Sequence, residues 1–295
     1  MFEHRTTEPV APKRVVVMGA GGFVGSAIVQ RLKAEGVAVV ALMRRDVDLL
    51  DKDAVYRFAA ILRPDDTLVF ISAVAPCKDN TMLLQNVTMM ASACEALEDT
   101  PVAHVIYISS DAVYADSPVP LTEDSCAGPA SLHGAMHCAR EVMLKTVVHS
   151  PLAILRPSLL YGAADTHNGY GPNQFRRLAA EGHDIVLFGE GEERRDHVFI
   201  DDVAEIVRLA TMYCSTGVLN VATGDVFPFR EVAEMVAANF SPRPAIRTTP
   251  RKGPMPHGGY RAFDSTACCR AFPRFRFTPL SEGLAKAHRD MTEVR

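Results

Sequence analysis

The stretch VVVMGAGGFVGSAIVQRL, residues 15–32, sets the fold class of this chain. A run of apolar, mostly β-branched residues passes into an amphipathic segment, which predicts a buried strand followed by a helix. Between them Gly19, Gly22 and Gly25 form a G-x-x-G-x-x-G turn. Glycines here allow a tight turn and close approach to a pyrophosphate, which the free N–H groups at the helix N-terminus would bind. The stretch predicts a dinucleotide-binding unit; the alternative is a glycine turn that only packs.

The same strand and helix patterns alternate through the first two thirds of the chain. The apolar runs are RVVVMG, VAVVALM, TLVFISA, HVIYIS, LAILRP and VLNVAT. Continuous apolar runs are typical of strands buried on both faces, and alternation with helices indicates a parallel sheet. We therefore expect an α/β, doubly wound parallel sheet (Rossmann-type) with a smaller C-terminal substrate-binding lobe. The expected division is a dinucleotide-binding domain at 13–156, to which 197–223 return, a lobe at 157–196 and 224–295, and a disordered lead-in at 1–12.

Composition narrows the class of partner. The chain has 295 residues, of which 48% are hydrophobic and 22% charged, and a net charge of −4. This charge gives no electrostatic reason to expect nucleic acid or an anionic membrane as partner. No apolar run approaches the ~20 residues that span a bilayer, and the N-terminus lacks the apolar core of a signal peptide. Seven cysteines without CxxC spacing indicate reduced thiols, so we expect a cytoplasmic protein with no metal held by cysteines.

Several motifs together resemble one family. They are GAGGFVG, Asn86 in LLQNVTMM, VIYISSDAVYAD, ILRPSLLYG, RRDHVFIDDVA and LNVATGD. From about Arg14 to near the C-terminus the chain resembles the extended short-chain dehydrogenase/reductases, the NAD(P)-dependent nucleotide-sugar epimerases, dehydratases and reductases. The resemblance implies a hydride-transfer enzyme acting on a nucleotide-activated sugar. We expect a homodimer, with neither nucleic acid nor membrane as partner.

The end of the second predicted strand bears on the cofactor. An acidic residue that would bind a ribose 2′-hydroxyl is expected there, but Met43 occupies the position and Arg44 and Arg45 follow it. Two guanidinium groups suit a 2′-phosphate, so we expect NADP, with NAD as the alternative if the arginines are only solvated. The expected cofactor contacts are Gly19, Gly22, Phe23, Gly25, Arg44, Arg45, Asp48, Leu49, Ala73, Ser109, His137 and Pro157.

The resemblance also implies where the chemistry occurs. Ser110 matches the family residue that bonds the reacting hydroxyl or carbonyl, and Asp111 occupies the position of an acid in the sugar dehydratases. The family carries Tyr-x-x-x-Lys on the following helix, where the tyrosine exchanges the substrate proton and the lysine lowers its pKa. His133 and His137 stand at the matching positions in this chain. We expect Ser110, Asp111, His133 and His137 to be the catalytic group.

Three interpretations of the two histidines stay open at this point. His133 can transfer the proton itself, because imidazole has an ordinary pKa of about 6.5. Alternatively, the protein binds dinucleotide but has lost hydride transfer and acts as a sensor or partner-binding module. Thirdly, histidines four apart on a helix can bind a metal, with Asp111 or His167 as a third ligand, although we expect no metal. Beside these three functional interpretations, the simplest alternative is that the two are surface histidines without a role.

Expected substrate contacts come from the later segments. Asn173 and Arg195 resemble family residues that contact the nucleotide diphosphate, and Arg261 is expected to be a second arginine there. Bidentate guanidinium–phosphate bonding is the physical reason for arginines at such a place. The alternative is that these arginines pair with nearby carboxylates such as Glu193. Leu159 stands where the family often has an asparagine, which puts the usual sugar pose in doubt.

Overall fold

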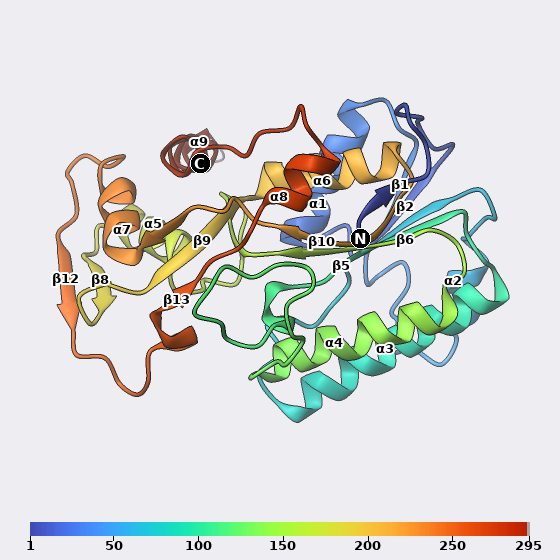
Figure 1. The fold of residues 1–295 in the computed structure, drawn as a ribbon, viewed down its shortest axis with the longest axis horizontal. Coiled ribbons are helices and arrows are strands. Elements are labelled where there is room, and N and C mark those ends of the chain that lie inside the picture. Colours follow the sequence, from blue (N-terminus) through green and yellow to red (C-terminus); the bar gives the residue numbers. More distant parts are fainter. Residues whose placement is uncertain (294–295) are drawn as a thin grey trace.

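The structure, a computed structural model that describes residues 1–293, is organised around a seven-stranded sheet (Figure 1). The strand order is β1-β10-β6-β5-β4-β2-β3, and every pair is parallel except β1 with β10. This is the doubly wound sheet expected from the alternation of strands and helices. The strands are β1 (Glu3–His4), β2 (Val15–Met18), β3 (Val39–Leu42), β4 (Thr67–Phe70), β5 (His104–Ile108), β6 (Leu152–Pro157) and β10 (Ser215–Val221).

Helices cover both faces of this sheet. One face carries α1, α6 and α8, and the other carries α2, α3 and α4 (Figure 1). The strand β2 shows why its sequence is apolar throughout: Val15 and Val17 pack under α1 and α6, while Val16 and Met18 pack in the opposite cluster. The helices are α1 (Phe23–Ala34), α2 (Ala54–Ala59), α3 (Asn80–Asp99), α4 (Leu132–Val147), α6 (Ile200–Met212) and α8 (Thr266–Ala271).

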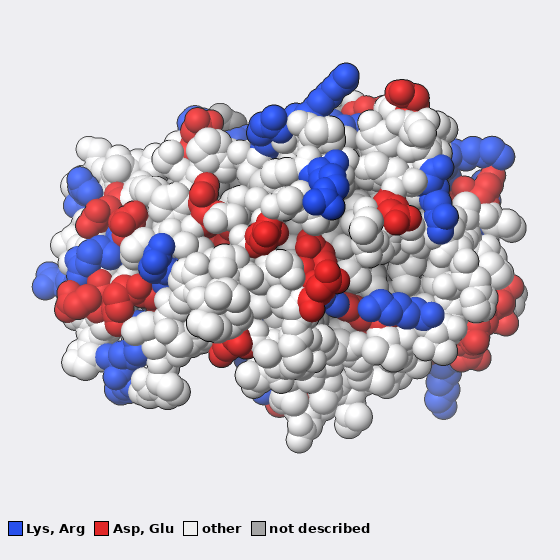
Figure 2. All heavy atoms as spheres, in the orientation of Figure 1, with Lys and Arg blue, Asp and Glu red and all other residues white. Residues whose placement is uncertain are grey.

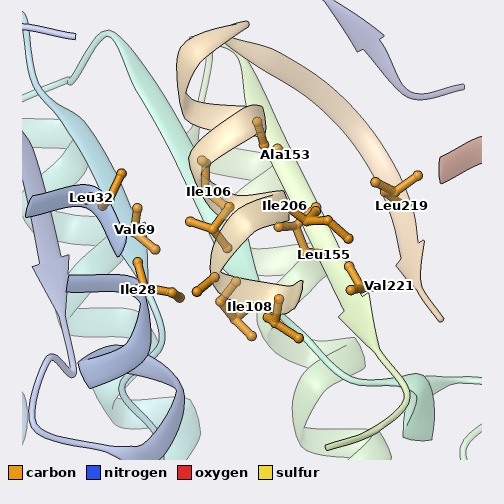
Figure 3. Packing of buried hydrophobic residues seen from close by; sticks show 14 of the residues in the cluster. Ile28, Leu32, Val69, Ile106, Ile108, Ala153, Leu155, Ile206, Leu219 and Val221 are labelled. Atoms are coloured by element: carbon orange, nitrogen blue, oxygen red, sulfur yellow. The ribbon is translucent and has the colours of Figure 1, made fainter. Parts of the chain in front are cut away.

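The core between the sheet and the α1–α6 layer is closely interlocked. Figure 3 shows Ile28 of α1 beside Val69 and Ile206 of α6 beside Leu155, with Ile106 of β5 between them. These side chains are fully buried or nearly so. The helices are therefore fixed on the sheet by apolar packing, which leaves the loops at the strand ends free to carry polar groups.

The topology defines where a ligand should bind. From β2 the chain crosses to β3 on one side and then returns past β2 to β4 on the other. In open α/β sheets, ligands bind in the crevice at the carboxyl ends of the strands where the order reverses. That point lies between β2 and β4, at Gly19 and Ser72.

A second region packs beyond this edge of the large sheet (Figure 1). Here β9 lies between β11 and β13 and also pairs with β7, while β8 pairs with β12. The core of this region includes Phe175, Phe199 and Phe229. The bounds expected for this region, 157–196 and 224–295, stay a prediction. Its elements are β7 (Leu159–Tyr161), α5 (Pro172–Ala180), β8 (Ile185–Phe188), β9 (Arg194–Phe199), β11 (Val226–Pro228), α7 (Phe229–Ala237), β12 (Ile246–Thr249), β13 (Tyr260–Arg261) and α9 (Leu280–Glu293).

The N-terminal segment corrects one expectation. Residues 1–12, expected to be a disordered lead-in, include β1, which pairs antiparallel with β10. The His4 ring bonds the Ser215 hydroxyl at 2.8 Å and the Ala271 carbonyl at 2.8 Å, and it stacks on Tyr213. A two-residue strand has no detectable periodicity, so these long-range contacts have no local signal in the sequence.

The surface carries charges of both signs. Figure 2 shows acidic and basic side chains interspersed over the visible face, in keeping with the small net charge. Within residues 1–293, none of the helices combines the length and the apolar composition that a membrane crossing requires.

The glycine turn gives the first test of this structure. We expect Gly25→Ala to lower the free energy of unfolding, because the added Cβ would lie 2.1 Å from the Gly19 carbonyl oxygen, a backbone atom. Overpacking costs about 1–3 kcal/mol or more and outweighs the ~1 kcal/mol that alanine gains over glycine in a helix. Urea unfolding measures the difference.

Gly169→Ala is the matched control, because a Cβ there meets open space. Its unfolding free energy should stay within about 0.5 kcal/mol of the parent. A Gly25→Ala protein as stable as the Gly169→Ala protein would contradict the described packing of the turn.

Candidate active site

The glycine turn forms one wall of the crevice. Gly19 has φ +98°, and a Cβ there would lie 2.7 Å from the Ser72 amide nitrogen, so the ends of β2 and β4 touch. Among the described residues, no side chain caps the N-terminus of α1 at Gly22, and Gly21 and Gly22 are exposed. Uncapped N–H groups beside an open glycine backbone fit an anionic pyrophosphate. The Phe23 ring closes the turn by lying against Gly162.

The segment after β3 differs in part from the expectation. Arg44 donates to Asp48 at 2.8 Å, and this hydrogen bond is the main reason why the pKa of Asp48 is lowered. Asp48 is therefore already engaged by an arginine that we expected to face the cofactor. Leu49 is 2% exposed and packs in the apolar cluster under α2 and α3, so any contact of this residue with the adenine would be made by its backbone. Arg45 is exposed.

The segment after β4 is held by a buried asparagine. The Asn86 side chain accepts from the Val74 amide and donates to the Val74 carbonyl, both at 2.9 Å. The amide–amide pair fixes Ala73, the adjoining residue, at the carboxyl end of β4. Three residues after Val74, the Cys77 N–H points at His133 Nδ1, at 3.4 Å. The segment therefore links the glycine turn to the histidine pair.

The two serines after β5 have different roles. Ser109 is buried and its hydroxyl donates to Glu141 at 2.6 Å, so this hydroxyl is engaged inside the protein. The Ser110 hydroxyl oxygen accepts from the Ala112 amide at 3.1 Å and caps a short 3-10 helix at Asp111–Val113. The Ser110 hydroxyl donates only weakly, to Asp111 at 3.4 Å. Its proton can turn to an incoming oxygen.

A close helix approach brings α4 onto the turn that follows this serine. Ser131 caps α4 by accepting from the Gly134 amide at 3.2 Å. A Cβ on Gly134 would lie 2.0 Å from the Ala112 carbonyl oxygen, so only glycine lets α4 rest on the 3-10 turn. His133 precedes this contact. Gly134 therefore sets the distance between α4 and the turn at Ser110–Val113, and it lies next to His133 in the chain.

The two histidine rings meet edge to face, with centroids 4.8 Å apart. His133 is half-buried, and burial lowers its pKa, with Asp111 opposing and His167 reinforcing the shift. His137 is buried, and its Nδ1 lies 2.7 Å from the Tyr107 hydroxyl. Burial lowers the pKa of His137 well below the usual value, so its ring is neutral. In residues 1–293, no three His, Cys, Asp or Glu side chains are grouped to hold a metal ion.

Arg261 is placed differently from the expectation. Its guanidinium is 2% exposed, donates to the Asp111 carboxylate at 2.8 Å and bonds the Asp111 carbonyl. It also donates to Asp116 at 3.2 Å. We expected Arg261 to bind a diphosphate, but two carboxylates occupy it instead. The same ion pair holds the Asp111 carboxylate, expected to be part of the catalytic group, as a partner of arginine.

The remaining expected substrate residues line the second region. The Asn173 side chain bonds the Gly162 amide and the Leu160 carbonyl, so its amide is used internally. Arg195 is 14% exposed on its side chain and lies 3.3 Å from Glu193, the kind of carboxylate pairing kept open as an alternative. An open hollow of about 650 Å³ lies nearby, lined by Asp116, Ser117, Pro118, Arg194, His257, Gly258 and Tyr260.

A buried ion pair fixes α4 to the sheet. Glu141 binds Arg156 of β6 through two hydrogen bonds, at 2.9 and 2.6 Å. Burial raises the pKa of Glu141, but the Arg156 hydrogen bonds and charge outweigh it, so the net shift is downward. Arg156 also donates to Tyr114, which donates to Asn220 of β10. Glu141 was not among the residues predicted from the sequence, because a charge on the apolar face of a helix is the only signal that it gives there.

Comparisons with known proteins agree with this architecture. The model of the NAD dependent epimerase/dehydratase family matches residues 15–222. A UDP-glucose 4-epimerase of Mycolicibacterium smegmatis is 28% identical over 259 residues, covering 76% of this chain and 82% of the relative. A UDP-glucose 4-epimerase from Thermus thermophilus in complex with NAD has TM-score 0.82 and 24% identity, covering 96% of this chain and 100% of that one. A GDP-L-fucose synthetase from Naegleria fowleri bound to NADP has TM-score 0.82 and 19% identity, covering 98% and 96%.

The buried ion pair predicts a non-additive pair of variants. Arg156→Met should lower the free energy of unfolding by about 3–5 kcal/mol, because it leaves Glu141 charged and buried. Adding Glu141→Gln should recover part of this loss, because the unpaired charge is removed. Urea unfolding of the parent, of Arg156→Met, of Glu141→Gln and of the double variant completes the double-mutant cycle.

The pH dependence of the single variant follows from linkage. In Arg156→Met, burial is the largest cause acting on Glu141 and is opposed only by the Ser109 hydrogen bond and the Lys145 charge, so the folded pKa of Glu141 rises relative to the parent. The loss relative to the parent should therefore be largest near neutral pH and shrink toward about pH 5, where Glu141 can take up a proton. Additive losses, or a loss independent of pH, would contradict a coupled ion pair.

Proposed function

Because this chain belongs to the NAD dependent epimerase/dehydratase family, we propose that it binds a nicotinamide dinucleotide and transfers hydride to or from a nucleotide-activated sugar, with His133 and Ser110 managing the proton. A bound nicotinamide supplies the hydride acceptor or donor. The protein residues bind, orient the reacting oxygen and move its proton. The supporting observation is the close contact of Gly134, the neighbour of His133, with Ala112 in the turn that Ser110 caps.

Proton movement follows from the hydrogen bonds of these two side chains. When a carbinol carbon loses hydride, its hydroxyl proton must leave, and a neutral imidazole nitrogen of His133 accepts it. The Cys77 amide donates to His133 Nδ1 and so favours the ring form with hydrogen on Nε2, but at 3.4 Å this bond is weak. In the ring form with hydrogen on Nδ1, Nε2 serves as the acceptor. The Ser110 hydroxyl then donates to the substrate oxygen. In the reverse direction the imidazolium returns the proton.

The substrate side is supported by the hollow next to Arg195. Its volume of about 650 Å³ is in the range of small-molecule sites, and Arg194, His257 and Tyr260 line it. Arg194 lies over the Tyr260 ring at 5.5 Å, which presents a cation and an aromatic face together. Arg195 can exchange its Glu193 contact for a diphosphate oxygen, which is a stronger bidentate partner. This favours a nucleoside diphosphate sugar as the substrate class.

The preferred cofactor form is NADP. Arg45 is exposed beyond β3, and Met43 occupies the place where a carboxylate would repel a 2′-phosphate. Arg44 can leave Asp48, because its side chain is 78% exposed. Solved relatives of this fold have been obtained with NAD and with NADP. The arginine pair is the feature of this chain that favours NADP.

A thermal-shift screen tests the substrate class. The protein with NADP should be stabilised by at least one nucleoside diphosphate sugar, because a ligand that binds only the folded state raises the melting temperature. Stabilisation by non-phosphorylated carbonyl compounds alone would contradict the proposal.

His133→Gln should lower turnover by about 10²–10⁴-fold, the usual contribution of a general acid–base group. Dinucleotide affinity should stay within about threefold, because Gln is a neutral side chain of similar size. In the parent, kcat/KM in the oxidising direction should stay constant down to the ordinary imidazole pKa of about 6.5 and fall only below it, since burial lowers the pKa of His133 and only its neutral form accepts a proton. Steady-state kinetics with calorimetric titration measures both.

His149→Gln is the control, because His149 is exposed just beyond the far end of the same helix. His149→Gln should change neither turnover nor dinucleotide affinity. Turnover that survives His133→Gln would show that another group carries the proton.

Cofactor preference has its own test. NADP should bind more tightly than NAD, and Arg45→Ala should reduce this preference by about tenfold or more, as expected for loss of one charge-assisted contact. Calorimetric titration of both cofactors decides the question. Tighter binding of NAD, unchanged by Arg44→Ala and Arg45→Ala, would contradict NADP.

A further inference from the structure

Arg140 is an unusual residue beneath the proposed active site. It lies on α4 three residues after His137, and none of its surface is exposed. Its guanidinium donates to the Ser72 carbonyl at 2.6 Å and contacts the Met136 sulfur at 3.8 Å, whereas its Nε has no partner among the described residues. Burying a cation without a carboxylate partner is strongly unfavourable. The sequence therefore keeps a positive charge here at a cost to stability.

Arg140 is directed at the aromatic residues that support the histidines. Its guanidinium lies 5.2 Å from the Phe70 ring centroid and 5.7 Å from that of Tyr107. The Tyr107 hydroxyl lies 2.7 Å from His137 Nδ1, and the His137 ring contacts the His133 ring. Arg140, Tyr107, His137 and His133 thus form one continuous series from the core to the crevice. The Ser72 carbonyl joins the same guanidinium to the floor of the glycine turn.

Hydrogen-bond chemistry decides the direction of the Tyr107–His137 bond. A guanidinium has donors only, so it cannot accept the tyrosine proton. Burial raises the pKa of Tyr107 to about 12, so the hydroxyl keeps its proton, and the nearby Arg140 charge makes it a better donor. A protonated His137 would be a second buried cation beside Arg140. His137 is therefore a neutral ring that accepts at Nδ1 and carries its hydrogen on Nε2.

We propose that Arg140 and Tyr107 are positioning residues that lock His137 as a neutral Nε2–H donor and supply the fixed positive charge of the site, so that His133 alone takes up and releases the proton. The catalytic meaning of this arrangement rests on the proposed function. Two unlocked histidines in contact would titrate as a coupled pair and share the proton. With His137 held as the neutral Nε2–H form, the transferred proton is taken up at His133 alone.

The charged and titratable groups around the pair come from several elements. They are Tyr107 on β5, Asp111 on the 3-10 turn, His167 in the loop after β7, Arg140 on α4 itself and, behind Arg140, Cys94 on α3. Asp111, although paired with Arg261, is the carboxylate that acts on His133, whereas the charge that acts on His137 is that of Arg140. The field therefore favours protonation of His133 over that of His137.

Nitrogen-15 NMR of the histidine side chains in the protein without cofactor tests the proposal. His133→Gln and His137→Gln assign the signals. His137 should show one neutral Nε2–H pattern that does not change between about pH 5.5 and about pH 8, whereas His133 should titrate below the ordinary imidazole pKa of about 6.5. A His137 ring that carries its proton on Nδ1, or that titrates near neutral pH, would overturn the proposal.

Two variants test which residues impose the lock. Tyr107→Phe removes only the hydroxyl, so His137 should become a mixture of tautomers. Arg140→Met removes the charge, so the titration of His137 should move to higher pH. Arg176→Met is the matched control, since Arg176 is a buried arginine on α5 that binds the Gly162 and Ala163 carbonyls. It should leave the His133 and His137 signals unchanged.

The outcomes separate this inference from the proposed function. If Arg140→Met does not fold, Tyr107→Phe still decides whether the hydroxyl sets the tautomer. Unchanged His137 signals in Tyr107→Phe would overturn the proposal, and so would changes equally large in Arg176→Met. If the lock is found but no nucleotide sugar is turned over, the proposed function fails while the inference about protonation holds. If turnover is found and its pH profile is the same in Arg140→Met, the assigned role of the charge is wrong.

Discussion

The buried pair of Glu141 and Arg156 is the contact on which the geometry of the site depends. It joins the middle of α4 to β6, and through Ser109 and Tyr114 it extends to the end of β5 and to β10. A helix packed only by apolar contacts can slide on a sheet, whereas two directional charge-assisted bonds define one register. Such a pair adds little net stability over apolar packing, since desolvation offsets the attraction. Its effect is to define where the first two turns of α4 lie.

Once α4 is fixed, the order along its length explains the site. From the core outward come Arg140 against β4 and β5, His137 against Tyr107, and His133 at the crevice. Gly134 then rests on the serine turn. Arg140 is charged and fixed, His137 is neutral and fixed, and His133 is half-buried and can titrate. A fixed supporting layer under one mobile proton is the arrangement that general acid–base catalysis requires.

The sequence predicted the parts of this structure that have local signals. The glycine turn, the buried strands and the helix carrying His133 and His137 follow from short-range patterns, so the fold class was confirmed. The pairing of Arg261 with Asp111 joins residues 150 positions apart, and no spacing rule indicates it. Arg140 reads as an ordinary helix arginine until tertiary packing encloses it. The strand at Glu3–His4 exists only because β10 offers an edge to pair with.

We propose that His133 supports hydride transfer at the position where the family carries a tyrosine. Rapid mixing of the protein loaded with oxidised NADP and a nucleotide sugar that binds it tests this claim directly. The absorbance of reduced nicotinamide should appear in the parent protein and rise more slowly as the pH falls below the imidazole range. A bound sugar that never produces reduced nicotinamide at any pH would contradict the account and leave a protein that binds dinucleotide without hydride transfer.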